Sequence, residues 1–370
     1  MTTVSRGENS SLTAAVNSAD ITVPRRDNSV LTDHSSQIYA AIDLGTVTSR
    51  LLLGRVDSFG VEPLFKDMVI TNLGEGLSAS RRISAAALDR LLAALRGFKE
   101  HIVAAQVDLA GENSNTTIPV RVVATSAMRD AHNSTEVLAK IRELGFETEV
   151  ISGIEEAELS FGGALSGFSS LPEPVLTVDV GGGSTELILG RKNSSCSAPV
   201  SSVRPESFEK PLVYTEHSFD VGSRRVTELF LHSDPPTPTE LEQAKSWIHC
   251  QLSAFIAELP ATPVECIAVA GTATSAITIR DEIAVFESRL VHGKRLETAQ
   301  LDALIQMLAA LPLAERQQVI GLHPDRAPVI VGGLLVLQVI LEATGCGSFV
   351  ASDTDILQGI LLEQATANGR

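Results

Sequence analysis

Two short turns in the sequence carry residue types that bind phosphate. Each follows a strand-like run and begins with an aspartate, Asp43 or Asp179, two residues before a glycine. Glycine has no side chain to block a phosphate, and its backbone adopts anion-binding conformations, so the N–H groups of such turns can donate to phosphate oxygens. The residues expected to form this cradle are Gly45, Thr46 and Thr48 in the first turn and Gly181, Gly182, Gly183, Ser184 and Thr185 in the second.

The two turns belong to an internal repeat. Residues 42–55 and 178–191 align at a constant offset of 136, and six of their fourteen positions are identical. A turn of this kind, taken alone, is more often a tight hairpin connection than a binding loop. Its repetition with the aspartate retained favours a duplicated α/β domain in which both turns face one cleft.

Several carboxylates near these turns have the chemistry that hydrolysis needs. Asp43, Asp179 and Glu186 offer the oxygen ligands that Mg²⁺ prefers, with N-cap, turn or surface roles as the alternatives. A Ser-Gly break precedes Glu155 and Glu156 at the start of a helix. Acidic residues are common in a first helical turn because they offset the helix dipole. The functional alternative is that one of the two is a general base acting on a water.

Two further segments with small side chains follow predicted strands. Arg129 comes after a strand at 119–124, and its guanidinium matches phosphate with two parallel hydrogen bonds. Gly271 and Thr272 follow a strand at 265–270, in what we expect to be a loop suited to another phosphate or to a nucleotide. Other signatures fail: the glycines at 162–167 lack the Walker A lysine, the histidines show no zinc pattern, and no G-x-S-x-G element occurs.

Composition limits the class of protein. The 370 residues carry 29 Lys and Arg against 45 Asp and Glu, a net charge of −16. This balance argues against nucleic acid and against an anionic membrane as partners. The four cysteines have no pairing pattern and predict free thiols, and the N-terminus lacks the apolar core of a secretory signal. We therefore expect a cytoplasmic protein.

Hydrophobic periodicity places the elements around these motifs. Residues 1–37 show none and predict a disordered tail, while 191–211 read as a surface loop. Ser84 can cap a long amphipathic helix, and capping boxes at Asn133 and Thr237 predict two more. Further helical patterns cover 298–310, 327–344 and 353–366, and strands are expected at 61–70, 119–124, 146–151, 212–218 and 265–270. Alternating strands and helices indicate an α/β protein.

The ordered motifs resemble the Ppx/GppA family of exopolyphosphatases and guanosine pentaphosphate (pppGpp) phosphohydrolases. The resemblance runs from about residue 38 to the end and rests on the segments 41–46, 73–77, 124–133, 151–157, 178–187, 219–228 and 269–274. It implies duplicated actin-like (ribonuclease H-like) domains with the site between them. Domain I would cover 38–160, joined by the helix at 353–368, and domain II would cover 161–352.

The resemblance also implies roles for residues. Glu156 would be the general base, and Asp43, Asp179 and Glu186 would hold Mg²⁺ and water. Arg129 would contact phosphate. Exopolyphosphatase activity is the expected function, and pppGpp hydrolysis is the alternative. A sugar kinase or ATPase of the same superfamily and a non-catalytic phosphate-polymer binder are further alternatives, and a homodimer is expected as a possible assembly. Val47 and Asn72 depart from the family pattern, and Val47 removes a side-chain donor from the first turn.

Overall fold

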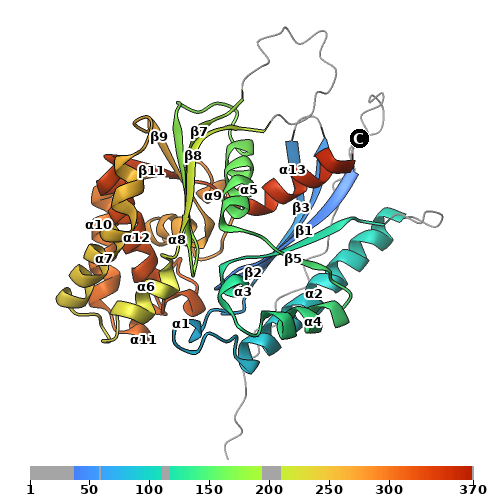
Figure 1. The fold of residues 1–370 in the computed structure, drawn as a ribbon, viewed down its shortest axis with the longest axis horizontal. Coiled ribbons are helices and arrows are strands. Elements are labelled where there is room, and N and C mark those ends of the chain that lie inside the picture. Colours follow the sequence, from blue (N-terminus) through green and yellow to red (C-terminus); the bar gives the residue numbers. More distant parts are fainter. Residues whose placement is uncertain (1–36, 58–59, 111–116, 194–209, 369–370) are drawn as a thin grey trace, which may run out of the picture. The chain divides into compact units, whose positions relative to one another are not determined.

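The computed structural model describes residues 37–57, 60–110, 117–193 and 210–368, which form two β-sheets with helices on both faces (Figure 1). The strands of the first sheet are β1 (Gln37–Leu44), β2 (Thr48–Asp57), β3 (Gly60–Ile70), β4 (Val120–Ala124) and β5 (Thr148–Val150). Those of the second are β6 (Val175–Val180), β7 (Thr185–Arg191), β8 (Leu212–Phe219), β9 (Glu265–Val269), β10 (Arg295–Glu297) and β11 (Ser348–Ala351).

Both sheets follow one pattern of strand pairing. The first has the order β3-β2-β1-β4-β5 and the second the order β10-β11-β9-β6-β7-β8. The strands β1 and β6 each pair antiparallel with the next strand of their hairpin, and each pairs parallel with a later strand, β4 or β9. This arrangement confirms the duplicated α/β fold that we expected of an actin-like protein.

The two hairpins also match in detail. The Gly45 N–H donates to the Thr48 carbonyl at 2.9 Å, and the Gly181 N–H donates to the Ser184 carbonyl at 3.0 Å. The two donors occupy equivalent positions 136 residues apart, and so do the two acceptors. The strand register then shifts at equivalent positions, residues 53–54 of one hairpin and 189–190 of the other. The sequence repeat is therefore a structural repeat that extends to the hydrogen bonds of its turns.

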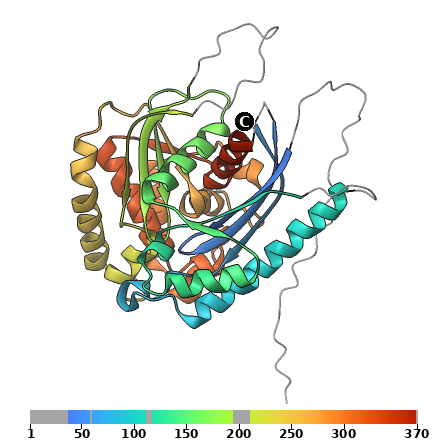
Figure 2. The ribbon, with the colours of Figure 1, turned by 45° about the vertical axis from the view of Figure 1, so that its right-hand side comes forward.

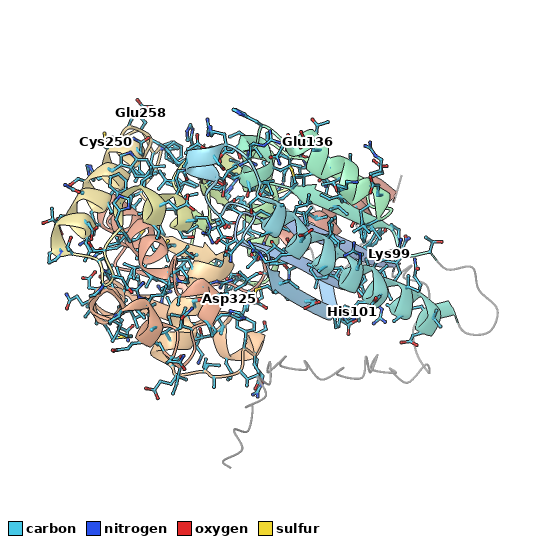
Figure 3. All side chains as sticks on the ribbon, turned by 90° about the horizontal axis from the view of Figure 1, so that it is seen from below. Lys99, His101, Glu136, Cys250, Glu258 and Asp325 are labelled. Carbon is cyan, nitrogen blue, oxygen red and sulfur yellow. The ribbon has the colours of Figure 1, made fainter. Side chains whose placement is uncertain are left out.

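Long helices cover the outer faces of the two halves (Figures 1 and 2). α2 (Ala85–Ala110) and α4 (Ser134–Glu143) belong to the core of the first half, and α7 (Pro238–Ala257), α10 (Thr298–Ala310) and α12 (Ile330–Thr344) to that of the second. Seen from below, Lys99 and His101 of α2 lie far from Cys250 of α7 (Figure 3). The shorter helices are α1 (Leu77–Ser80), α3 (Ser126–Asp130), α6 (Ser223–Phe230), α8 (Ala270–Arg280), α9 (Ser288–Val291), α11 (Leu313–Arg316) and a 3₁₀ turn at Pro324–Arg326.

Two helices fill the space between the sheets. α5 (Gly153–Ser166) packs on β7 and β8, α13 (Ile356–Asn368) packs on β1 and β2, and the two helices pack on each other. Glycines at the crossing allow this contact. A Cβ on Gly163 would lie 1.8 Å from the Asp355 carbonyl oxygen, and one on Gly359 would lie 2.0 Å from that of Leu159. The C-terminal helix thus lies on the first sheet, while the domain limits at 38–160 and 161–352 stay a prediction.

Most predicted elements are present, and their caps explain where they begin. Ser84 accepts a hydrogen bond from the Ala87 N–H at 3.2 Å, ahead of α2. Thr237 and Glu240 form the predicted capping box of α7. The left-handed backbone of Gly145 (φ 91°) follows α4, as the predicted helix end requires.

Two local predictions are wrong. Asn133 does not cap α4, because its side-chain amide instead binds both the N–H and the carbonyl of Ile83, at 2.9 and 3.0 Å. A carboxamide offers both an acceptor and donors, so it can satisfy the two backbone groups at once. The loop expected at Gly271 is the first turn of α8, where small side chains allow the helix to pack closely against Arg326.

Some predictions fall on residues that the structure does not describe. These are the tail before Gln37, the part of the predicted loop at 194–209, and Cys196 within it. The other three cysteines are free thiols, as expected. None of the helices in the described ranges has both the length and the apolar character needed to cross a membrane.

The crossing of α5 and α13 yields a stability prediction. Gly163→Ala should destabilise the protein by about 1–3 kcal/mol or more, because its Cβ meets backbone atoms that cannot move aside. The neighbouring Gly162 has nothing within 4 Å of its Cβ position, so Gly162→Ala should be neutral or stabilising by up to about 1 kcal/mol. Denaturant midpoints of the two variants measure the difference, and equal midpoints would contradict the close crossing.

Candidate active site

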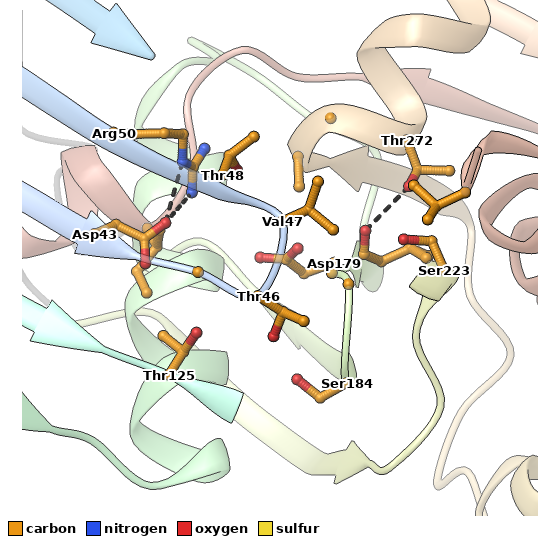
Figure 4. Close-up of a pocket in the computed structure, with 18 of the residues that line it drawn as sticks. Asp43, Thr46, Val47, Thr48, Arg50, Thr125, Asp179, Ser184, Ser223 and Thr272 are labelled. Atoms are coloured by element: carbon orange, nitrogen blue, oxygen red, sulfur yellow. Dashed lines mark hydrogen bonds and ion pairs between the residues drawn. The ribbon is translucent and has the colours of Figure 1, made fainter. Parts of the chain in front are cut away.

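The two glycine turns face one cleft between the sheets. The cleft has an open volume of about 680 Å³, and Asp43 and Thr46 line it from the first half while Asp179 and Ser184 line it from the second (Figure 4). The other predicted residues that reach it are Gly45, Thr48, Glu156, Gly181, Gly182, Gly271 and Thr272. The structure therefore brings together residues from four separate predicted motifs.

Neighbouring segments hold both turns in shape. In the first turn the carbonyls of Thr46 and Val47 accept backbone hydrogen bonds from Gly74 and Asn72, each at 2.9 Å. In the second, the N–H groups of Ser223 and Arg224 at the start of α6 donate to the carbonyls of Gly181 and Gly182, again at 2.9 Å. The segments around Gly74 and Gly222, which the sequence analysis used only for the family resemblance, thus fix the conformation of the turns.

This bonding leaves donors available in the turns. Among the described residues, the backbone N–H groups of Thr46, Val47, Gly182 and Gly183 have no hydrogen-bond acceptor. Successive free N–H groups in a turn form a concave anion site. Val47 loses the side-chain donor that the family pattern offers, but its backbone N–H remains. Its methyl group packs on the opposite turn, where a Cβ on Gly182 would lie 2.6 Å away.

Asp43 is held in place by a buried ion-pair chain. Arg50 donates to one carboxylate oxygen of Asp43, Oδ2, through Nε at 3.1 Å and Nη2 at 2.7 Å, and its Nη1 binds Asp355 (Figure 4 shows the Asp43 contacts). The other oxygen, Asp43 Oδ1, is buried and has no partner among the described residues. Burial raises the pKa of Asp43, and the neighbouring Arg50 opposes this rise. Arg50 therefore orients Asp43 and leaves one oxygen free.

Glu156 lies at the start of α5 and reaches the cleft. Ser152 caps this helix by accepting from the Glu155 N–H, which fixes the register of the first turn. The Glu156 carboxylate is buried and accepts a hydrogen bond from Arg129 Nη1 at 2.7 Å. Burial raises the pKa of Glu156 to about 7, the positive charge of Arg129 lowers it, and Asp179 and Asp43 raise it further. A carboxylate of this kind accepts a proton near neutral pH.

Asp179 lies at the wall of the cleft, whereas Glu186 lies deeper in the protein. Asp179 lines the cleft and accepts from the Ser160 hydroxyl at 2.7 Å, and burial raises its pKa to about 6. Glu186 is fully buried behind the second turn, where it accepts from Ser218 at 2.7 Å, and it does not line the cleft. Burial first, and then Glu156 and Asp179, raise the pKa of Glu186 well above its usual range.

The acidic residues fit a cation that the protein binds together with the substrate phosphates better than a cation enclosed by protein ligands alone. Among the described residues, no three Asp, Glu, His or Cys side chains converge on a metal position. Mg²⁺ in phosphoryl-transfer sites is commonly held by one or two carboxylates, waters and the substrate phosphates. Asp43, with its unpartnered Oδ1, and Asp179 match this donor set. Three carboxylates against two arginines line the cleft, so an anionic substrate needs added positive charge there.

Several predicted phosphate ligands lie outside the cleft lining. Thr185 is buried and its hydroxyl donates to the Val221 carbonyl. Arg129 binds Glu156 and the Ile151 carbonyl. Gly183 faces a neighbouring cavity. Their contacts with phosphate remain predictions.

Sequence reasoning missed other residues that line the cleft, namely Arg50, Thr125, Ser223 and Arg326. Arg326 Nη1 donates to the Gly271 carbonyl at 2.8 Å and to Ser275 at 3.1 Å, and in the described structure it has no carboxylate partner. Burial lowers the pKa of Arg326 to about 10, with Arg50 adding to the effect, so it stays cationic at neutral pH. Arg50 could have been singled out in the sequence, because it is a charged residue inside an apolar strand. No sequence pattern marks Arg326 as a functional residue.

Comparison with known proteins gives the family. The model of the Ppx/GppA phosphatase family matches residues 53–367. The chain belongs to this family. It is 31% identical over 341 residues to exopolyphosphatase 2 of Mycobacterium tuberculosis, and the aligned residues cover 88% of this chain and 98% of that protein. It is 28% identical over 334 residues to the guanosine-5'-triphosphate,3'-diphosphate pyrophosphatase of Aeromonas hydrophila, covering 89% of this chain and 59% of that protein.

A solved structure supports the same assignment. An exopolyphosphatase-like protein superposes with a TM-score of 0.77 at 33% identity, covering 89% of this chain and 98% of that one. The resemblance found in the sequence is thereby confirmed, and so is the expectation that the protein is a phosphohydrolase of the Ppx/GppA type.

The ion-pair chain yields a second prediction. Arg50→Gln leaves Asp43 and Asp355 buried without their cation, which should cost about 3–5 kcal/mol of unfolding free energy at neutral pH. Arg50 helps to hold the pKa of Asp355 below its usual value against the effect of burial. That stabilisation exists above the unfolded pKa and is lost as pH falls, so the cost of the substitution should shrink toward acid pH.

The matched control is Arg55→Gln on the same strand. Arg55 pairs with Glu62 at 2.7 Å in a partly exposed position, so its loss should cost no more than about 1 kcal/mol at any pH. Urea unfolding from about pH 2 to pH 8 compares the two variants, because the loss of stability linked to Asp355 lies below its unfolded pKa. A cost for Arg50→Gln that matches the control, or that does not vary with pH, would contradict the buried chain.

Proposed function

We propose that the protein is an exopolyphosphatase that uses Mg²⁺ to remove the terminal phosphate of inorganic polyphosphate. The observation that carries this proposal is the position of Glu156, a buried carboxylate with a pKa raised to about 7, in a cleft lined by two turns with free N–H groups. A base for water and a cradle for a phosphoryl group are the two parts that phosphate anhydride hydrolysis requires. The relative named exopolyphosphatase 2 supports this choice of substrate.

The residues would act in one displacement. Glu156 accepts a proton from a water whose oxygen attacks the terminal phosphorus, and the bond from that phosphorus to the bridging oxygen breaks. The bridging oxygen leaves with the shortened chain, and orthophosphate is the other product. The free N–H groups of both turns donate to the phosphoryl oxygens as charge builds on them. Mg²⁺, held by Asp43 and Asp179 together with the substrate, would supply the positive charge that the cleft lacks.

Hydrolysis of pppGpp is the second candidate. It uses the same residues on the 5′ phosphate of a nucleotide, and the relative from Aeromonas hydrophila carries that activity in its name. One observation favours it: Val329 and Ile330 place apolar side chains in the cleft beside Arg326. Apolar contact beside a guanidinium suits the base of a nucleotide, whereas a phosphate chain gains nothing from the apolar side chains. The two substrates are therefore compared directly.

The test of the proposed function is Glu156→Gln. The amide keeps the shape of the side chain but cannot take a proton from water, so phosphate release should fall by about 10²–10⁴-fold. Release is measured with Mg²⁺ from long polyphosphate, tripolyphosphate and pppGpp in parallel. The preferred substrate has the highest kcat/KM.

Glu155→Gln is the matched control on the same helical turn. Glu155 is partly exposed and pairs with Arg121 at 3.3 Å, so its substitution should leave turnover within a few-fold of wild type. Equal losses in both variants would mean that the helix start, and not the base, is damaged. A wild-type protein that binds polyphosphate without turnover would be a non-catalytic binder, and ATP-dependent transfer to a sugar would indicate a kinase.

The pH profile gives a further prediction. The base must be deprotonated, so kcat/KM should rise with pH through the pKa of Glu156, near 7. Arg129 lowers that pKa through its charge and its hydrogen bond. Arg129→Gln should therefore move the acidic limb of the profile to higher pH. Arg121→Gln, which removes a cation paired with Glu149 and Glu155, should leave the limb in place.

The two possible roles of Arg129 separate in this experiment. Loss of a phosphate contact raises KM at every pH, whereas loss of the pairing with Glu156 moves the limb. An unmoved limb in Arg129→Gln would contradict the assignment of Glu156 as the titrating base.

A further inference from the structure

A second cavity lies on the far side of the two turns. This side pocket is open to solvent, and the space in it, open solvent included, is about 280 Å³; its lining includes Arg81, Ser126, Asp130, Gly183, Arg224 and Arg225. It shares Thr46 and Gly182 with the cleft, so the two spaces have a common wall. The activity proposed above makes no use of it.

Neighbouring residues of the same segments form the common wall and face into different spaces. In the second turn Ser184 faces the cleft while its neighbour Gly183 faces the side pocket. Thr125 and Ser126 divide in the same way at the end of β4. The opposing surfaces touch through small groups, since a Cβ on Gly183 would lie 2.4 Å from Ser126 Oγ and 3.0 Å from Thr46 Oγ1. At this point the two spaces are separated by the contact of Gly183 with the Ser126 and Thr46 side chains.

The side pocket has the charge that the cleft lacks. Three arginines and one acidic residue, Asp130, line it, although the whole protein carries a net charge of −16. The cleft lining instead contains more carboxylates than guanidinium groups. An oxyanion can therefore bind in the side pocket without a metal ion, and serine hydroxyls at positions 78 and 126 add neutral donors.

The arginines are only partly satisfied by the protein. Arg81 is exposed and, in the part of the chain that the structure describes, has no ion pair. Arg224 binds the neutral Asn72 and lies 3.7 Å from Glu228, and its Nε is buried without an acceptor. Arg225 binds Asp130 at 2.6 Å and the Gly183 carbonyl at 2.9 Å. Two of the three thus keep donors for a ligand.

A polymer substrate gives such a site a purpose. The terminal phosphate must reach Glu156, so the remaining chain occupies the path from the base to the mouth of the cleft. The orthophosphate formed by hydrolysis then cannot leave through the mouth unless the chain leaves first. An anion site behind the wall offers a separate route.

We propose that the side pocket is a metal-independent phosphate site that receives the released orthophosphate. This inference rests on the proposed function for the origin of its ligand, but its binding chemistry does not. Arg81 and Arg224 bind the phosphate oxygens, and Arg225 neutralises Asp130 through their ion pair. The chemical class of ligand is a tetrahedral oxyanion of the size of orthophosphate.

The test separates the site from turnover. Orthophosphate is titrated by calorimetry into the wild-type protein in EDTA, where no metal ion offsets the surplus of carboxylates in the cleft. One phosphate should bind, and Arg81→Gln on this background should weaken that binding at least tenfold. Arg82→Gln is the control, because Arg82 pairs with Glu136 on the exposed surface and does not line the pocket. Absence of binding in EDTA, or equal affinities in the two variants, would overturn the proposal.

Two further measurements identify the source of the ligand and guard against misfolding. Tripolyphosphate should bind in EDTA more weakly than orthophosphate; tighter binding that Arg81→Gln abolishes would make the pocket a site for the polymer and would overturn the product assignment. In the active protein, orthophosphate should inhibit polyphosphate hydrolysis in a mixed mode that Arg81→Gln turns competitive. An unchanged thermal midpoint for Arg81→Gln confirms that it folds. Normal turnover in Glu156→Gln would contradict the proposed function alone and leave the EDTA titration valid.

Discussion

The close crossing of α5 and α13 is the contact on which the site depends. The first turn of α5 carries Glu156, and Asp355, which caps the start of α13 through the Leu357 N–H, binds Arg50. Arg50 in turn orients Asp43. The glycines at the crossing allow the helix backbones to touch. The contact between the two helices therefore positions both Glu156 and, through Arg50, Asp43. Because packed interiors transmit small displacements, a larger residue there should disturb both carboxylates together.

The repeat explains why the cleft is nearly symmetric while its chemistry is not. Each half supplies a hairpin turn with the same internal hydrogen bond, and each turn is held by N–H groups from a following segment. The differences lie in what stands behind the turns. Behind the first, Arg50 neutralises Asp43, while Asp179 in the second accepts from the Ser160 hydroxyl, its one direct side-chain donor among the described residues, and Glu186 lies buried behind it. The second hairpin therefore carries two carboxylates with raised pKa values.

The fold and much of the cleft could be predicted from the sequence because they depend on local patterns. The repeat fixes two equivalent hairpins, and glycine with aspartate marks their turns. Residues whose role depends on distant partners could not be predicted in this way. Arg50 and Asp355 are 305 positions apart, and nothing local to either indicates the pair. Asn133 illustrates the reverse error, since a good capping residue found a better partner in the backbone of Ile83.

Charge links the cleft to its surroundings. Burying several carboxylates near one another is unfavourable unless cations neutralise them, and the arginines within the cleft do so only in part. A divalent cation that arrives with a phosphate substrate, as in the proposed function, would offset this deficit. The arginines behind the turns line a different space from these carboxylates and retain donors of their own. In the function proposed above, a protein with a net negative charge would in this way hold a metal ion on one side of its turns and an anion on the other.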